Sequence, residues 1–227
     1  MKRKIDVSVS LDPVSGFQNP IDYAKSLQGY ADFLHCDVMD GKFVEKTTFD
    51  HEFVKTLNSQ TLLPLDVHLM CDEPFDNIDK YISAGANIIT VHYEAFKDKG
   101  KLINVFKKIR EGKALAGLSF KPKTKVQEIK SFLFYVDLVL VMSVEPGMSG
   151  QNFMPESIEK VKQLNDLRDG DNLAFKIEVD GGIDDKNAHL ICEMGADILV
   201  SGSYIYKSVS REKAIKKLKN SLKLQKK

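Results

Sequence analysis

Cysteine is scarce in this chain, and its spacing argues against two kinds of cross-linked fold. The 227 residues include three cysteines, Cys36, Cys71 and Cys192. They are unevenly spaced and form no Cys-x-x-Cys pair, so neither a disulfide framework nor a zinc knuckle is indicated. We therefore expect a protein of a reducing compartment, the cytoplasm.

An excess of one charge is also missing, as are long hydrophobic runs. Lysine plus arginine number 33 and aspartate plus glutamate 32, a net charge of +1. This balance gives no broad electrostatic footprint for nucleic acid or an anionic membrane. The longest apolar stretch, Phe132 to Met142, is interrupted by Asp137 and is shorter than the roughly 20 residues of a membrane helix. The basic N-terminus, residues 1–4, precedes an alternating strand rather than the apolar core of a signal peptide.

Lysines are concentrated in segment 213–227. Apolar residues recur there at helical spacing, at Ala214, Ile215, Leu218 and Leu222. This pattern is typical of a helix that buries one face and exposes its lysines to solvent.

No Pro/Gly/Ser-rich linker divides the chain, and we expect residues 1–227 to form one domain. Apolar runs of strand length alternate with segments of helical spacing. The runs are Ile5–Ser10, Ala31–Asp37, Leu63–Leu69, Asn87–His92, Ala114–Ser119, Val136–Met142, Ala174–Val179 and Asp197–Ser201. The helical segments include Phe75–Ala84, Leu102–Ile109, Val126–Leu133 and Ile158–Leu167.

About eight strand-and-helix units without a break predict an α/β protein, a closed (β/α)8 TIM barrel, over an open doubly wound sheet. In such a barrel the carboxyl ends of the strands carry the active site. The polar or sulfur-containing side chains expected at this mouth are His35, Asp37, His68, His92, Ser119, Met142 and Asp180.

Three strand ends carry metal-ligating residue types. His35 and Asp37 are two residues apart, so both side chains point to the same side of a strand. His68 and Asp180 end two further strands, and two histidines with two aspartates could meet around one ion. Taken singly, each histidine reads better as a hydrogen-bonded core residue and each aspartate before glycine as a turn.

Glycine-rich segments follow the last three predicted strands. They are Glu145–Gln151, Asp180–Ile183 and Ser201–Ser203. Glycines let backbone N–H groups approach a ligand closely, and barrels commonly bind phosphate at the loops after strands seven and eight. The ligand we expect is a small phosphorylated molecule.

These motifs together resemble the ribulose-phosphate 3-epimerase family, from Ile5 to about Tyr206. The resemblance is carried by His35-x-Asp37-x-Met39-Asp40-Gly41-x-Phe43-Val44, Asp66-Val67-His68-Leu69-Met70, Val141 to Gly147, Val179 to Ile183, and Val200 to Ser203. It implies a metal-dependent isomerase of the pentose phosphate pathway that interconverts D-ribulose 5-phosphate and D-xylulose 5-phosphate at C3. It also implies a homo-oligomer, a dimer or hexamer.

The resemblance assigns His35, Asp37, His68 and Asp180 to one divalent ion per subunit, with Zn²⁺ or Fe²⁺ ahead of Mn²⁺ or Co²⁺. It gives Asp37 and Asp180 a second role as the acid and base that move a proton through an enediolate. Asp40 and Gly41 are interpreted as the turn after the strand, and Cys36 and Val38 as wall residues.

The same resemblance implies a set of substrate contacts. Ser10 is favoured over Ser8 in the first strand, while His92 is interpreted as structural. The pocket-wall residues are Met39, Met70 and Met142, against ordinary core packing as the alternative. The other expected contacts are His68, Gly147, Met148, Ser149, Gly150, Asp180, Gly181, Gly182, Gly202 and Ser203.

One position in these contacts departs from the family pattern. Ser149 stands where the family commonly has glycine in a Gly-Phe-Gly-Gly-Gln loop, so the backbone there must be one that a non-glycine residue adopts. Segment Ser10-Leu11-Asp12-Pro13 is also unusual for the family.

Three rival functions remain. An epimerase of a six-carbon ketose phosphate, such as D-allulose 6-phosphate, would share the metal and both aspartates. The decarboxylases with an Asp-x-Lys-x-x-Asp motif are disfavoured because residues 35–40 contain no lysine. A catalytically inactive phosphosugar-binding protein is disfavoured because all four ligands are present.

Overall fold

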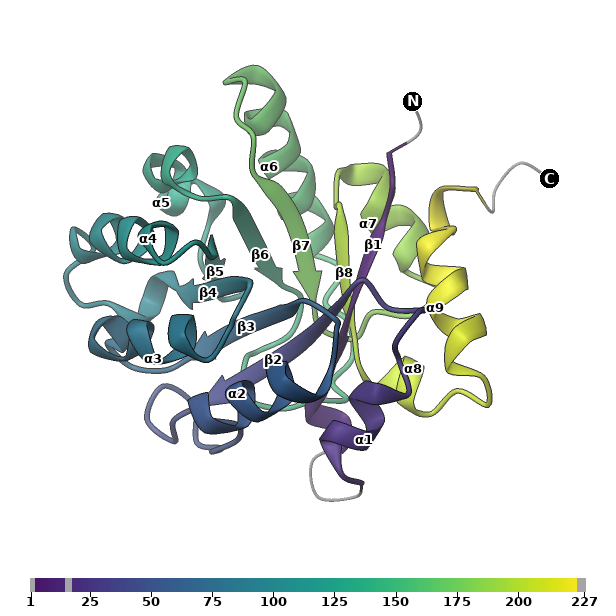
Figure 1. Ribbon diagram of the computed structural model, residues 1–227. Helices are drawn as coiled ribbons and strands as arrows, with labels where there is room; N and C mark the ends of the chain where they lie inside the picture. The colour runs from purple at the N-terminus through teal and green to yellow at the C-terminus, as the bar shows by residue number, and fades with distance from the viewer. Residues whose placement is uncertain (1–2, 15–17, 224–227) are drawn as a thin grey trace.

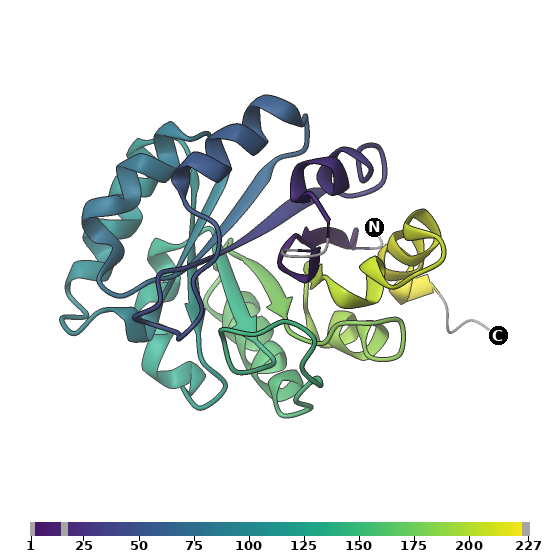
Figure 2. The same cartoon turned by 90° about the horizontal axis from the view of Figure 1, so that it is seen from below.

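The strands of the protein form a closed parallel barrel surrounded by helices (Figures 1 and 2). The computed structural model describes residues 3–14 and 18–223. Strands β1 to β8 follow one another around the barrel in sequence order, and β8 closes it against β1. The predicted (β/α)8 TIM barrel is therefore confirmed.

The strands begin and end close to the predicted apolar runs. They are β1 Asp6–Ser10, β2 Phe33–Met39, β3 Leu65–Met70, β4 Ile88–His92, β5 Leu115–Phe120, β6 Leu138–Met142, β7 Lys176–Asp180 and β8 Ile198–Ser201.

Helices follow the strands and form the outer layer. They are α1 Pro20–Lys25, α2 His51–Gln60, α3 Ile78–Ser83, α4 Lys101–Glu111, α5 Val126–Ile129, α6 Ser157–Gly170, α7 Ala188–Met194, α8 Ser203–Tyr206 and α9 Arg211–Lys219. Short 3₁₀ helices are η1 Asp12–Val14, η2 Pro74–Asn77, η3 Tyr93–Ala95, η4 Lys130–Tyr135 and η5 Ser221–Lys223.

The helices differ from the sequence prediction in several places, and the segment predicted over Phe75–Ala84 begins as 3₁₀ helix η2 before α3. The segment predicted over Val126–Leu133 is α-helical only to Ile129 and continues as 3₁₀ helix η4. Helices α1, α7, α8 and α2 lie outside the helical segments named from the sequence; in α2 only Val54 and Leu57 are buried, so its apolar pattern is weak. Its start does carry a signal, since the Asp50 carboxylate accepts the backbone N–H of Phe53 at 2.9 Å, as an N-cap does.

The lysine-rich segment forms the expected amphipathic helix. In α9, Ala214, Ile215 and Leu218 are buried beneath exposed lysines, and Leu222 of η5 packs against the same core. Residues 224–227 of the predicted segment lie outside the described residues. Within the described chain, no helix has the length and apolar character needed to cross a bilayer.

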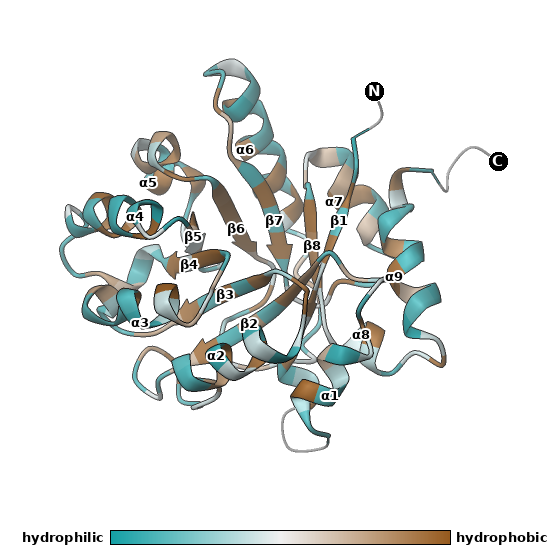
Figure 3. Cartoon of the chain, viewed as in Figure 1, coloured by the Kyte–Doolittle hydropathy of each residue, from teal (hydrophilic) through white to brown (hydrophobic). Residues whose placement is uncertain are grey.

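The strands of the barrel are largely hydrophobic (Figure 3), and the buried hydrophobic residues form two clusters. Outward-facing side chains such as Val7, Cys36 and Val38 join the core between barrel and helices. A smaller cluster that includes Leu138 and Leu140 packs on its own. Along each strand, side chains point alternately toward the helices and toward the barrel axis. This alternation directs polar side chains of β2, β3 and β7 inward.

Strand register sets those polar side chains at matching heights. His35 of β2 pairs with Asp66 of β3, and Asp37 pairs with His68. On the opposite side, Asp180 ends β7. The ends of three strands therefore meet at one mouth of the barrel.

A hydrogen-bond motif is repeated at the other mouth, where the strands begin. The residue before each even-numbered strand is Asp or Asn, and its carboxylate or amide oxygen accepts a backbone N–H of the preceding odd strand, at 2.7–2.9 Å. The backbone N–H of that Asp or Asn donates to the carbonyl of the same partner, at 2.7–3.0 Å. We call these pairs the strand clamps; they are Asp32–Val7, Asn87–Leu65, Asp137–Ala116 and Asp197–Ile177.

Candidate active site

A cavity of about 700 Å³ opens at the carboxyl ends of the strands. Its lining includes Ser10, Asp37 and Asp180. The predicted wall residues also line it: Met39, Met70 and Met142. Most of the remaining lining comes from loop residues 144–153, 180–185 and 202–204, and Asp12, Pro13 and Lys207 are among the others.

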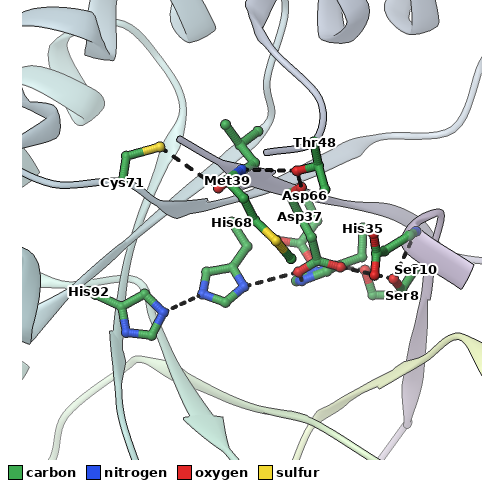
Figure 4. Close-up of polar contacts among 12 residues, drawn as sticks. Ser8, Ser10, His35, Asp37, Met39, Thr48, Asp66, His68, Cys71 and His92 are labelled. Atoms are coloured by element: carbon green, nitrogen blue, oxygen red, sulfur yellow. Dashed lines mark hydrogen bonds and ion pairs between the residues drawn. The ribbon is translucent and has the colours of Figure 1, made fainter. Parts of the chain in front are cut away.

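Four side chains converge within this mouth of the barrel. Ligand atoms of His35, Asp37, His68 and Asp180 all lie within 4.8 Å of one another. His35 Nε2 and His68 Nδ1 each lie 3.3 Å from the same oxygen, Asp37 Oδ1 (Figure 4). Both imidazoles are fully buried, and among the described residues His35 Nε2 has no hydrogen-bond partner. Two imidazoles and two carboxylates in a tight cluster fit one divalent ion.

Further polar groups form hydrogen bonds with the side chains of this cluster. Asp66 Oδ2 lies 2.6 Å from His35 Nδ1 and accepts the hydroxyl of Ser8 at 2.8 Å. Ser10 donates to Asp37 Oδ2 at 2.9 Å and lines the cavity. Of the two serines considered from the sequence, Ser10 faces the cavity and Ser8 lies deeper, against Asp66.

The two aspartates of the cluster have pKa values displaced in opposite directions. Burial raises the pKa of Asp37, but the charge of His35, with smaller contributions from the two neighbouring imidazoles, outweighs it and holds that pKa well below its usual range. Burial and repulsion from Asp37 raise the pKa of Asp180 to about 7. One carboxyl is therefore a stable anion, and the other is poised near neutral pH to hold or release a proton.

Glycines after β7 and β8 let the loops that line the cavity pack closely together. Gly182 has φ +62°, and a Cβ there would lie 2.6 Å from the backbone nitrogen of Phe153. A Cβ on Gly202 would lie 2.6 Å from the Pro13 ring. Both positions exclude larger residues, and they leave the backbone exposed toward a ligand.

The loop after β6 lines one side of the cavity. Gly147 and Gly150 have φ values of +116° and +80°, whereas Ser149 is not among the described residues with positive φ. Serine therefore fits at 149 without backbone strain. The side-chain amide of Gln151 ties the loop together by donating to the carbonyls of Glu145 and Met148, at 2.6 and 2.9 Å.

Comparison with known proteins decides the family. Residues 7–206 match the ribulose-phosphate 3 epimerase family. The chain belongs to this family. Ribulose-phosphate 3-epimerase of Aquifex aeolicus (strain VF5) is 40% identical over 195 residues, covering 86% of each chain. That of Bacillus subtilis (strain 168) is 40% identical over 195 residues, covering 86% of this chain and 88% of the relative. Epimerases of this kind are isomerases, and the chain is an enzyme of this class.

Solved structures of lower identity share the epimerase's fold. A 3-hexulose-6-phosphate synthase aligns with a TM-score of 0.68 at 14% identity, covering 96% of this chain and 99% of the other. A 3-keto-L-gulonate-6-phosphate decarboxylase from Vibrio cholerae aligns with a TM-score of 0.69 at 14% identity, covering 98% of each. These similarities show a shared barrel.

Not all side chains predicted at the mouth of the epimerase barrel line its cavity. His35, His68, His92 and Ser119 are fully buried and lie outside the lining, although the first two belong to the four-residue cluster with Asp37 and Asp180. The turn interpretation of Asp40 agrees with its geometry, since its carboxylate accepts backbone N–H groups of Lys42 and Phe43 at 2.9 Å.

Sequence reasoning missed two buried carboxylates, Asp66 and Glu178, which with His35 bring ligand atoms within 4.8 Å of one another. Each precedes a predicted ligand by two residues and so shares its face of the strand. The spacing rule that paired His35 with Asp37 would have found both.

Proposed function

We propose that this member of the epimerase family interconverts D-ribulose 5-phosphate and D-xylulose 5-phosphate in a metal-dependent reaction. The observation that carries the proposal is the pair Asp37 and Asp180, which reach one cavity from β2 and β7 and bring ligand atoms within 4.8 Å of those of His35 and His68. Such a pair suits the removal of a proton from one face of a carbon and its return on the other.

The residues we assign to the metal are His35, Asp37, His68 and Asp180. Their donor set suits Zn²⁺ or Fe²⁺, with Mn²⁺ and Co²⁺ also compatible. A bound divalent ion supplies positive charge next to the substrate oxygens that become negative during the reaction.

The chain's own groups perform the proton transfer. For one epimer, the aspartate on the side of the C3–H bond accepts the proton as an enediolate develops. The other aspartate then donates a proton to the opposite face of C3, which inverts that carbon. In the reverse direction the two carboxyls exchange roles, so neither has to travel across the substrate.

The remaining cavity residues bind and shield the substrate in this proposal. Met39, Met70 and Met142 present apolar surface next to the reacting carbon and limit access of water. Ser10 contacts the sugar and orients Asp37, to which it donates a hydrogen bond at 2.9 Å. The proposed phosphate contacts lie in loop 147–150 and at Gly181, Gly182, Gly202 and Ser203.

The proposal extends to the setting of the protein. We infer a homo-oligomer, a dimer or hexamer, that acts in the cytoplasm on a small phosphorylated ketose. The free thiols of Cys36, Cys71 and Cys192 agree with a reducing compartment.

One experiment tests activity, substrate and metal together. The purified protein is incubated in D₂O with D-ribulose 5-phosphate or D-allulose 6-phosphate, and product and C3 deuterium are followed by NMR, alongside metal analysis. We expect pentose phosphate epimerisation with deuterium at C3, loss of activity on chelation, and recovery with Zn²⁺ or Fe²⁺.

Different outcomes would contradict different parts of the proposal. Faster turnover of the six-carbon sugar would reassign the substrate. Full activity in protein shown to be free of metal would contradict metal dependence. Absence of exchange with either sugar would contradict epimerisation altogether.

A further inference from the structure

The ring of His92, at the end of β4, lies next to the ring of His68. The two Nε2 atoms are 2.9 Å apart and the ring planes differ by 30° (Figure 4). Both side chains are fully buried. Two imidazole nitrogens at this distance share one hydrogen, so one ring donates and the other accepts.

Glu94 determines which ring is the donor. Its Oε2 lies 3.3 Å from His92 Nδ1, and a carboxylate only accepts. His92 therefore carries its hydrogen on Nδ1, and its Nε2 is a bare acceptor. His68 must then donate from Nε2, which leaves the lone pair of His68 Nδ1 facing Asp37 Oδ1 at 3.3 Å. A lone pair aimed at a carboxylate oxygen is favourable when a cation lies between them.

Glu94 is itself held by groups in the loop after β5. Its Oε1 accepts the backbone N–H of Lys121 at 2.8 Å and the hydroxyl of Thr124. The Lys160 ammonium of α6 fixes that loop by donating to three of its carbonyls, those of Lys121, Pro122 and Thr124, at 2.6–3.2 Å. The orientation of Glu94 is thus set by groups that do not touch the metal site.

Phe43 closes the other side of this array. Its ring centroid lies 4.8 Å from that of His92, and the Lys121 ammonium lies 4.2 Å above the Phe43 ring. His92 therefore has little freedom to rotate away from His68. A chain of hydrogen-bonded groups runs from the loop after β5 to the metal cluster.

We propose that Glu94 and His92 are positioning residues that fix the tautomer and ring orientation of His68, so that its Nδ1 faces the metal ion. This inference rests on the proposed metal site. It makes His68 the counterpart of His35, whose Nδ1 contacts a buried carboxylate, Asp66, directly at 2.6 Å. Partners of this kind behind a histidine ligand raise its affinity for metal.

Glu94→Gln is the sharpest test, because it replaces one oxygen by nitrogen. The Lys121 and Thr124 donors hold the remaining oxygen, so the new NH₂ group faces His92 Nδ1. His92 then becomes an Nε2 donor, and His68 is driven to the tautomer that carries hydrogen on Nδ1. We expect the Kd for Co²⁺, measured from visible absorption, to rise about 10- to 100-fold. The melting temperature of the metal-free protein should change little.

Three further variants make the result decisive. His92→Gln keeps an acceptor for His68 and should retain most Co²⁺ affinity, whereas His92→Leu should lose it. Glu73→Gln is the matched control, because Glu73 also accepts a backbone N–H, that of Lys97 at 3.0 Å, but does not contact His92. ¹⁵N NMR of the zinc-loaded protein reports the His68 tautomer directly.

The failure of this inference is distinct from failure of the metal site. Wild-type affinity in both Glu94→Gln and His92→Leu, or weakened affinity with an unchanged His68 tautomer, would overturn the positioning role alone. If Glu94→Gln does not fold, the contrast between the two His92 variants decides. If the His68→Ala variant binds Co²⁺ as tightly as the wild-type protein, the proposed metal site is overturned and this inference with it.

Discussion

At the scale of single residues, the site depends on two aspartate carboxyl groups whose pKa values differ because their surroundings differ. Asp37 lies between two imidazoles, whereas Asp180 faces the charge of Asp37. The same residue type thereby provides a stable anion and a group that titrates near neutrality. This difference is produced by the barrel, which brings β2 and β7 to one mouth.

Asp37→Asn and Asp180→Asn should each reduce epimerisation about 10²- to 10⁴-fold or more, because an amide neither accepts nor returns the C3 proton. Steady-state assays on both pentose phosphates measure this loss. Circular dichroism should show an intact barrel in each variant. Near-wild-type turnover by either variant would disprove the two-carboxyl mechanism.

Metal binding should release protons in a pH-dependent way. Burial lowers the pKa of His35, but attraction to Asp66 and Asp37 outweighs it and raises that pKa well above its usual value; the pKa of Asp180 is raised to about 7. Both groups are protonated in the metal-free protein at about pH 6, and both must lose the proton to bind metal. We expect about two protons released at pH 6 and about one fewer at pH 8.

Calorimetric titration of Zn²⁺ in buffers of different ionisation enthalpy counts these protons. Apparent affinity should strengthen as pH rises through 7, in the same direction as proton release. A constant proton count from pH 6 to pH 8 would show that Asp180 is ionised before metal arrives.

Much of this site was predictable from the sequence, because each polar residue ends an apolar run and strand ends share a mouth in the barrel. The depth of a side chain below that mouth was not predictable. Ser8 and Ser10 share a face of β1, and only the register of β1 with β2 puts Ser10 beside Asp37 and Ser8 beside Asp66.

At the scale of elements, the loops after β6 and β7 shape the cavity through backbone geometry rather than side-chain chemistry. Gly182 combines a φ of +62° with a Cβ direction that points into the backbone of residues 151 and 153. The two loops therefore fit together only if residue 182 lacks a side chain.

Gly182→Ala should raise the KM for the phosphosugar about tenfold, because strain of roughly 1–3 kcal/mol at this position displaces the proposed phosphate loop. Gly170→Ala, at the end of α6, is the matched control, since a Cβ there meets nothing within 4 Å and its φ is not positive. Steady-state kinetics measure the KM of both variants, and thermal melting compares their stability. Equal effects of both substitutions would contradict a role for the Gly182 geometry.

At the scale of the whole molecule, the four strand clamps close the barrel at the end opposite the active site. Three use a carboxylate and one, Asn87, uses a neutral amide. Charge is therefore dispensable to the motif, while an acceptor oxygen is common to all four. That residues 1–227 fold as one domain stays a prediction, which a single coincident unfolding transition by two probes would support.

Asp137→Ala should lower the free energy of unfolding by about 1–3 kcal/mol, because it leaves the buried N–H of Ala116 without its acceptor. Asp137→Asn should cost less than about 1 kcal/mol, since it keeps an oxygen and loses only a partly exposed ion pair with Arg110. Urea denaturation measures both. Equal destabilisation would mean that the ion pair, and not the clamp, matters.

The clamps also divide the barrel into four comparable pieces, each with two strands and the same junction. The same clamp is repeated in every pair of strands at one end of the barrel. At the opposite mouth, the residues differ from one pair to the next. New substrate preferences can therefore arise by exchange or insertion at the cavity loops, and recombination between related barrels has natural break points between β2 and β3, β4 and β5, and β6 and β7.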